Sequence, residues 1–169
     1  VYKEVGLVIK EENNINYYSN NIIKMIPKLK DEDIVYLAGS IIEGIGNEYS
    51  DLDVFVLSND IKEYEAEYDY KIYKVGFFKI ENMNCDVEYW DINSVHSIID
   101  QINSIDLNNE DIRTTNQIKV DNLSFGEIVS FVHRFNNSIC ICKHYRSICN
   151  LLWSAYRLVC RAFNRLYKI

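Results

Sequence analysis

The stretch that decides the fold is LAGSIIEGIGNEYSDLDVFV, residues 37–56. Its apolar ends predict two strands, the first leading into Gly39 and Ser40 and the second opening with Asp51 and Asp53. If the second run is a strand, both carboxylates leave the same face and can bind a divalent cation. Gly39 lets a ligand approach the main chain, and Ser40 with the following amides can hold phosphate oxygens. We therefore predict a phosphate-binding turn followed by a cation site.

A later run, CDVEYW at residues 85–90, supplies further carboxylates. Polar and apolar residues alternate there, so a strand would place Asp86 and Glu88 on one face and Cys85, Val87 and Tyr89 on the other. Taken alone, Asp51 and Asp53 could also be a solvent-exposed acidic turn without a function. The turn before them and the acidic strand after them favour a metal site instead.

Gly39-Ser40, ten intervening residues, and Asp51-Leu52-Asp53 between apolar flanks resemble the signature of the DNA polymerase beta-like nucleotidyltransferase superfamily. The resemblance covers about residues 34–90. It implies an α/β (α+β) fold with a mixed sheet and flanking helices, and Mg²⁺-dependent transfer of a nucleoside monophosphate from an NTP to a hydroxyl. The chain resembles the small stand-alone members that modify small molecules or proteins, with pyrophosphate as the second product.

The resemblance also implies a role for each site residue. Asp51 and Asp53 would bind one or two Mg²⁺ ions, and a third carboxylate would join them, Asp86 being our first choice and Glu88 the second. Gly39 and Ser40 would hold the β- and γ-phosphates of the NTP. Many members carry a basic residue where this chain has Glu43, and that departure removes one expected phosphate contact.

The periodicity of the remaining residues predicts an α/β core over residues 1–106, a linker over 107–123 and a C-terminal helical region over 124–169. The resemblance implies that the core is the nucleotidyltransferase catalytic unit. We predict the following elements: helices over 15–29, from Asp91 to 105, over 124–136 and over 143–169; strands over 34–38, 52–57, 70–80 and 85–90; a turn at 31–33; and a loop or exposed helix over 58–69.

Net charge is −7, yet from Phe131 onward there are seven Lys and Arg and no Asp or Glu. Arg157, Arg161 and Arg165 recur every four residues and predict one basic stripe on the last helix. This stripe suits either the triphosphate of an NTP or simple pairing with the acidic half of the chain. No apolar run reaches the ~20 residues of a membrane span, and no signal peptide is visible, so we expect a cytoplasmic protein without a membrane partner.

A second hypothesis remains open. Small chains of this kind also resemble antitoxin subunits that pair with a helical partner protein and have weak or no catalysis. The basic last helix and the exposed aromatic residues would then form an interface. RNA binding by the basic tail is the least favoured possibility, because the rest of the chain is acidic.

Overall fold

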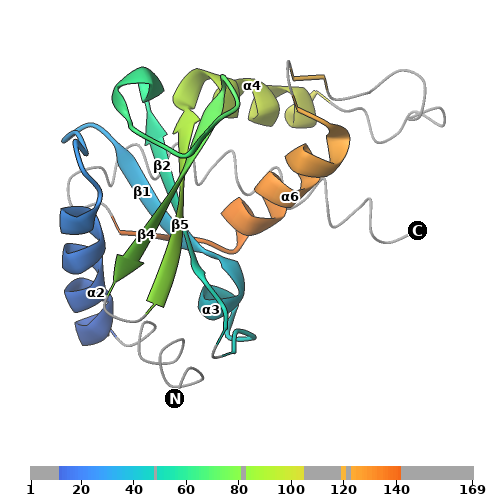
Figure 1. Ribbon diagram of the computed structural model, residues 1–169. Coiled ribbons are helices and arrows are strands. Elements are labelled where there is room, and N and C mark those ends of the chain that lie inside the picture. Colours follow the sequence, from blue (N-terminus) through green and yellow to red (C-terminus); the bar gives the residue numbers. More distant parts are fainter. Residues whose placement is uncertain (1–11, 48, 81–82, 105–118, 121–122, 142–169) are drawn as a thin grey trace.

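The protein has a mixed α/β architecture in which helices cover both faces of a six-stranded sheet (Figure 1). This computed structural model describes residues 12–47, 49–80, 83–104, 119–120 and 123–141. Residues 1–11 lie outside the described residues, as do the predicted helix over 143–169 and its Arg157 and Arg161. None of the helices in the described part of the chain is long and apolar enough to cross a membrane.

The sheet has the strand order β3-β4-β5-β2-β1-β6. β2 and β5 are parallel neighbours, and every other pairing is antiparallel. The strands are β1 Ile34–Ala38, β2 Leu52–Ser58, β3 Tyr68–Asp69, β4 Tyr73–Ile80, β5 Met83–Asp91 and β6 Ile139–Cys140. The parallel pair at the centre is what brings two acidic strands together, as described below.

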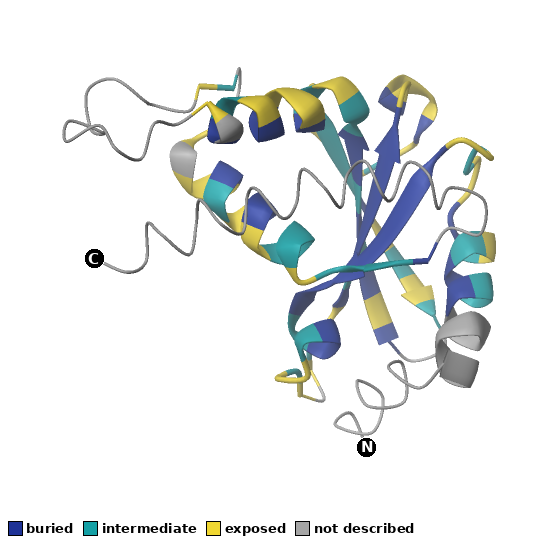
Figure 2. Cartoon of the chain, turned by 180° about the vertical axis from the view of Figure 1, so that it is seen from behind, coloured by how far each residue is buried: buried dark blue, intermediate teal, exposed yellow. Residues whose placement is uncertain are grey.

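Alternation along the central strands gives the sheet two apolar faces, each with its own core (Figure 2). One face packs against Ile22 and Ile26, from α2 (Glu12–Met25) and the residues just after it. The other packs against α4 (Ile92–Asn103) and α6 (Phe125–Asn136), with Phe55, Trp90 and Phe131 among its largest buried side chains. Because β1 and β2 are buried on both faces, they are nearly continuous apolar runs in the sequence.

The two helices predicted to begin at Asp91 and at residue 124 start there with side-chain caps. The Asp91 carboxylate accepts a hydrogen bond from the Ser94 amide at 2.8 Å and opens α4. Ser124 opens α6 with a reciprocal capping box, in which its hydroxyl accepts from the Glu127 amide and the Glu127 carboxylate accepts from the Ser124 amide. These bonds satisfy amides that have no partner within the helix.

The strand predicted over 70–80 begins later, at Tyr73. Lys71 adopts a φ of 71°, its amide donates to the Asp69 carboxylate, and the Tyr70 amide donates to the Tyr73 carbonyl. These contacts make a tight turn, so residues 68–69 form a separate short strand, β3, in a segment that we predicted to be a loop or exposed helix. The helix predicted over 15–29 ends at Met25, two residues before Pro27.

α6 and β6 follow the predicted linker and both belong to the packing around the sheet. α6 covers the same face as α4, and β6 pairs with β1 at the edge, Tyr36 lying opposite Cys140. Figure 1 shows α6 beside the central strands, close to α3 (Gly39–Glu43). The residues at the start of the basic half of the chain therefore face the acidic strands.

Candidate functional site

Four acidic side chains from two strands meet on the face of the sheet that α6 covers. The parallel pairing of β2 and β5 sets Asp53 directly beside Asp86, and Phe55 beside Glu88. Asp51 comes one residue before β2 and is exposed, close enough to raise the pKa values of Asp53 and Asp86. The shared face predicted for Asp86 and Glu88 is confirmed, and the two predicted acidic segments lie side by side.

Gly39 lies against this cluster, at the end of β1. Its φ of 83° is in the left-handed region, and a Cβ built there would lie 2.1 Å from Oδ2 of Asp53. Both the backbone conformation and the space demand glycine. The sequence suggested that Gly39 leaves room for a ligand, whereas in the structure the Asp53 carboxylate fills the space next to it.

We expect Gly39→Ala to destabilise the protein by about 2–4 kcal/mol, because alanine adds left-handed strain and displaces the Asp53 carboxylate. Urea unfolding followed by circular dichroism measures this loss. The matched control is Gly126→Ala in α6, where a Cβ has no neighbour closer than 4.0 Å and the helix favours alanine. Equal stability of the two variants would contradict the assigned role of Gly39.

Ser40 is the second residue of the short helix α3, and its carbonyl accepts from the amides of Ile45 at 3.0 Å and Gly46 at 2.8 Å. Its hydroxyl forms no hydrogen bond with the residues that the structure describes, which leaves it free to contact a ligand. Local hydrogen bonds fix the loop that follows: the Asn47 amide donates to the Ser50 hydroxyl, and the Tyr49 amide donates to the Asn47 side chain.

Arg134 of α6 reaches into the acidic cluster, and the sequence did not single it out. Its Nη1 donates to Oε1 of Glu88 at 2.6 Å and lies 3.9 Å from Oδ1 of Asp53. The guanidinium carbon also lies 5.0 Å from the ring centroid of Phe55, within the range of a cation–π contact. The Glu88 carboxylate has a second donor, Nε1 of Trp90 at 2.8 Å.

These bonds separate the two candidates for the third carboxylate. Both oxygens of Glu88 are already engaged, one by Arg134 and one by Trp90. Asp86 forms no hydrogen bond or ion pair within the described part of the chain. Asp86 is therefore the carboxylate that remains available beside Asp53.

Two carboxyl groups of the cluster, those of Asp53 and Asp86, have pKa values above their ordinary range. Burial raises the pKa of Asp53 to about 6, helped by the negative charges of Glu88, Asp86 and Asp51 and opposed by the positive charge of Arg134. Burial also raises the pKa of Asp86, with further contributions from Asp51 and Glu88. A site that holds more negative charge than its own partners neutralise favours an added cation.

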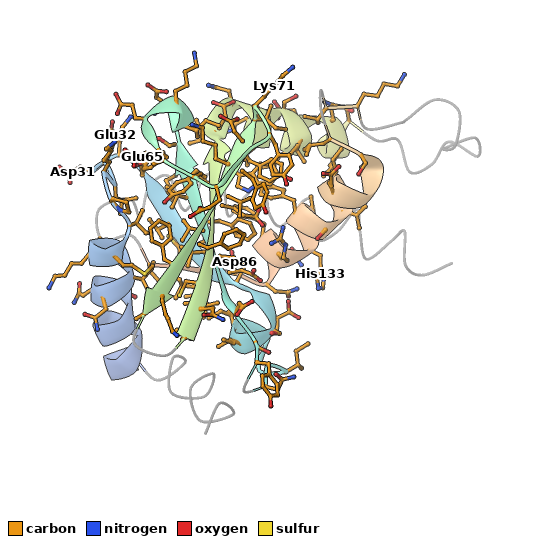
Figure 3. The ribbon with its side chains drawn as sticks, in the orientation of Figure 1. Asp31, Glu32, Glu65, Lys71, Asp86 and His133 are labelled. Carbon is orange, nitrogen blue, oxygen red and sulfur yellow. The ribbon has the colours of Figure 1, made fainter. Side chains whose placement is uncertain are left out.

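Glu43, where the resemblance led us to expect a basic residue, faces a basic side chain from another element. Nε2 of His133, one residue before Arg134 in α6, lies 3.7 Å from Oε1 of Glu43. Figure 3 labels Asp86 at the central strands and His133 at the neighbouring helix α6. α6 thus brings two basic side chains to the acidic cluster and the adjoining α3.

The donor set suits a hard divalent cation, which prefers carboxylate oxygens. Burial and the neighbouring negative charges raise the pKa values of Asp53 and Asp86, and a bound cation would oppose both effects. Among the described residues, however, no three acidic, histidine or cysteine side chains are arranged around a common point that could hold a metal ion. Cation binding would therefore require the carboxylates of Asp51, Asp53 and Asp86 to turn toward one another.

Comparison with family models and with curated proteins gave no match for this chain.

Proposed function

We propose that this protein is a nucleotidyltransferase of the DNA polymerase beta-like type, which moves a nucleoside monophosphate from an NTP to a hydroxyl group and releases pyrophosphate. One observation carries the proposal. The parallel pairing of β2 and β5 sets Asp53 beside Asp86, with Gly39 packed against Asp53. The turn and both acidic segments that support the resemblance therefore meet at one place.

Asp51, Asp53 and Asp86 would hold Mg²⁺, which supplies charge compensation for the phosphate oxygens. In the reaction the acceptor hydroxyl oxygen bonds to the α-phosphorus, and the bond from that phosphorus to the bridging oxygen breaks. The leaving group is pyrophosphate. Asp86 takes the proton of the acceptor hydroxyl.

Ser40 and Arg134 complete the proposed arrangement. Ser40 offers a hydroxyl to the β- and γ-phosphates from the end of β1. Arg134 keeps Glu88 in a fixed ion pair and places a permanent positive charge 3.9 Å from Asp53. That charge offsets part of the repulsion between the carboxylates before any substrate binds.

The proposal is tested by incubating the protein with each α-labelled NTP, Mg²⁺ and a metabolite extract, then separating labelled products. We expect one labelled product, absent with EDTA and reduced at least about 100-fold in Asp86→Asn. The matched control is Asp100→Asn, an exposed aspartate on α4 that should leave the yield unchanged. If no nucleotide gives a product, the hypothesis of a noncatalytic subunit that pairs with a helical protein replaces this one.

A further inference from the structure

Next to Asp86 the sheet exposes two aromatic rings to solvent. Phe77 of β4 is the direct cross-strand partner of Asp86 and is 48% exposed, and Tyr68 of β3 is 53% exposed. Directly opposite residues of an antiparallel pair share a face, with Cβ atoms about 4.5–5.5 Å apart. A molecule that reaches the Asp86 carboxylate from the β4 side therefore meets the Phe77 ring.

The two rings form one surface, which we call the aromatic shelf. Their centroids lie 5.9 Å apart in an edge-to-face arrangement, and Tyr70 stacks on Tyr68 at 6.4 Å. A series of stacked rings connects this surface to the core: Tyr70 stacks on Tyr73 at 4.6 Å, and Tyr73 stacks on the buried Trp90 at 4.5 Å. The Phe77 amide also donates to the Glu67 carboxylate at 3.1 Å, which fixes the strand beneath the ring.

Strand order places the shelf and the Gly39 turn on opposite sides of the acidic pair. In the order β4-β5-β2-β1, Phe77 belongs to β4 and the Gly39 turn follows β1, while Asp86 and Asp53 occupy the two strands between them. Attacking and leaving oxygens approach a transferred phosphoryl group from roughly opposite sides. A triphosphate held at Ser40 therefore leaves the shelf side for the acceptor.

We propose that the aromatic shelf is the acceptor site, and that the acceptor carries its hydroxyl on or next to a flat ring that stacks on Phe77 and Tyr68. The assignment of this ligand as the acceptor rests on the proposed function. Exposed aromatic rings bind the faces of planar groups with geometric preference. Phe77 and Tyr68 are specificity-determining residues in this proposal, and Asp86 receives the proton of the hydroxyl that they position.

The experiment uses the full chain with ¹³C-labelled Phe and Tyr rings and two probes, 4-nitrophenyl glucoside and glycerol. We expect the ring-bearing probe to shift the ring signals of Phe77 and Tyr68, and glycerol, which has hydroxyls but no ring, to leave them unchanged. Phe77→Leu should weaken binding of the ring-bearing probe about fivefold or more, and Phe77→Trp should retain it. Both substitutions are at an exposed position and keep an apolar side chain.

Tyr49→Ala is the matched control, because Tyr49 is 84% exposed in the loop between α3 and β2, on the other side of the acidic pair. It should not change binding of the ring-bearing probe. Absence of ring shifts, or a Phe77→Leu variant that loses Mg·ATP affinity instead, would overturn the proposal. If the protein transfers labelled nucleotide but the ring-bearing probe does not bind, the aromatic shelf is not the acceptor site and the proposed reaction stands. If the probe binds at the shelf but no nucleotide is transferred, the proposed reaction is wrong, and the shelf has no acceptor role.

Discussion

Asp53→Asn should abolish nucleotidyl transfer while making the folded protein more stable at neutral pH. Asp53 lies at the centre of the candidate site: it pairs in register with Asp86, packs against Gly39 and lies 3.9 Å from Arg134. Asparagine keeps the size of the side chain but removes the negative charge that a cation requires. We expect a loss of transfer of at least about 100-fold, measured with the α-labelled NTP.

The gain in stability follows from the raised pKa. The folded protein holds the Asp53 proton up to about pH 6, above the ordinary value of 3.8, so ionisation of this group weakens the fold. Its contribution to stability is fully present below pH 3.8 and is lost as the pH rises through about 6. Asparagine carries no such penalty, and we expect a gain on the order of 1 kcal/mol above pH 6 and little gain near pH 4.

Urea unfolding of both proteins between pH 4 and pH 8 measures this difference. Asp33→Asn is the matched control, because Asp33 is a buried carboxylate with a structural role: it accepts hydrogen bonds from the Lys30 amide and the Tyr64 hydroxyl. That variant should lose about 1 kcal/mol and keep its transfer activity. An Asp53→Asn protein that is less stable at pH 8 and still transfers nucleotide would contradict the functional assignment.

The sequence predicted the central part of the fold because that part depends on short-range patterns. The strand over residues 34–38 has the predicted bounds, and the strand that follows Asp51 is one residue longer than predicted. The alternation of CDVEYW correctly placed Asp86 and Glu88 on one face. Ser124 and Asp91 were recognisable as caps because each carries a side-chain acceptor three residues before the amide that it binds.

What the sequence missed depends on contacts between distant segments. β3 and β6 have two residues each, too few to show a period, and they exist because neighbouring strands offer them partners. Arg134 and Glu88 are 46 residues apart, so their ion pair depends on how α6 lies on the sheet. The only local signal was the position of Arg134 next to the apolar face of a predicted helix, three residues after Phe131.

The sequence also could not decide whether Asp86 or Glu88 is the third carboxylate, because that too depends on contacts between distant segments. Alternation makes the two residues equivalent, and it cannot tell which one has its oxygens occupied. The structure distinguishes them through the contacts of Glu88 with Arg134 and Trp90. The sequence did not predict the aromatic shelf for a related reason: Phe77 lies beside Asp86 only because of the antiparallel register of β4 and β5.

Arg134→Met should destabilise the protein by about 2–3 kcal/mol. Methionine retains the length of the side chain, but it leaves the Glu88 carboxylate, whose side chain is 12% exposed, with the Trp90 indole as its remaining donor. The variant also loses the cation–π contact with Phe55. Because Arg134 is the group that opposes the rise in the Asp53 pKa, its removal should raise that pKa further above 6.

A double-mutant cycle with Glu88→Gln separates the ion pair from the packing of the long side chain. Removing either partner leaves the other charge unpaired in a largely buried site. The loss of stability of the double variant should therefore be smaller than the sum of the losses of the two single variants, by at least about 1 kcal/mol. The Asp53 titration, followed by NMR, provides a second measurement. Additive losses combined with an unchanged Asp53 titration would show that Arg134 acts through packing alone. Coupling with a raised Asp53 pKa would instead identify Arg134 as the fixed positive charge that keeps Asp53 ionised at neutral pH and ready to bind a cation.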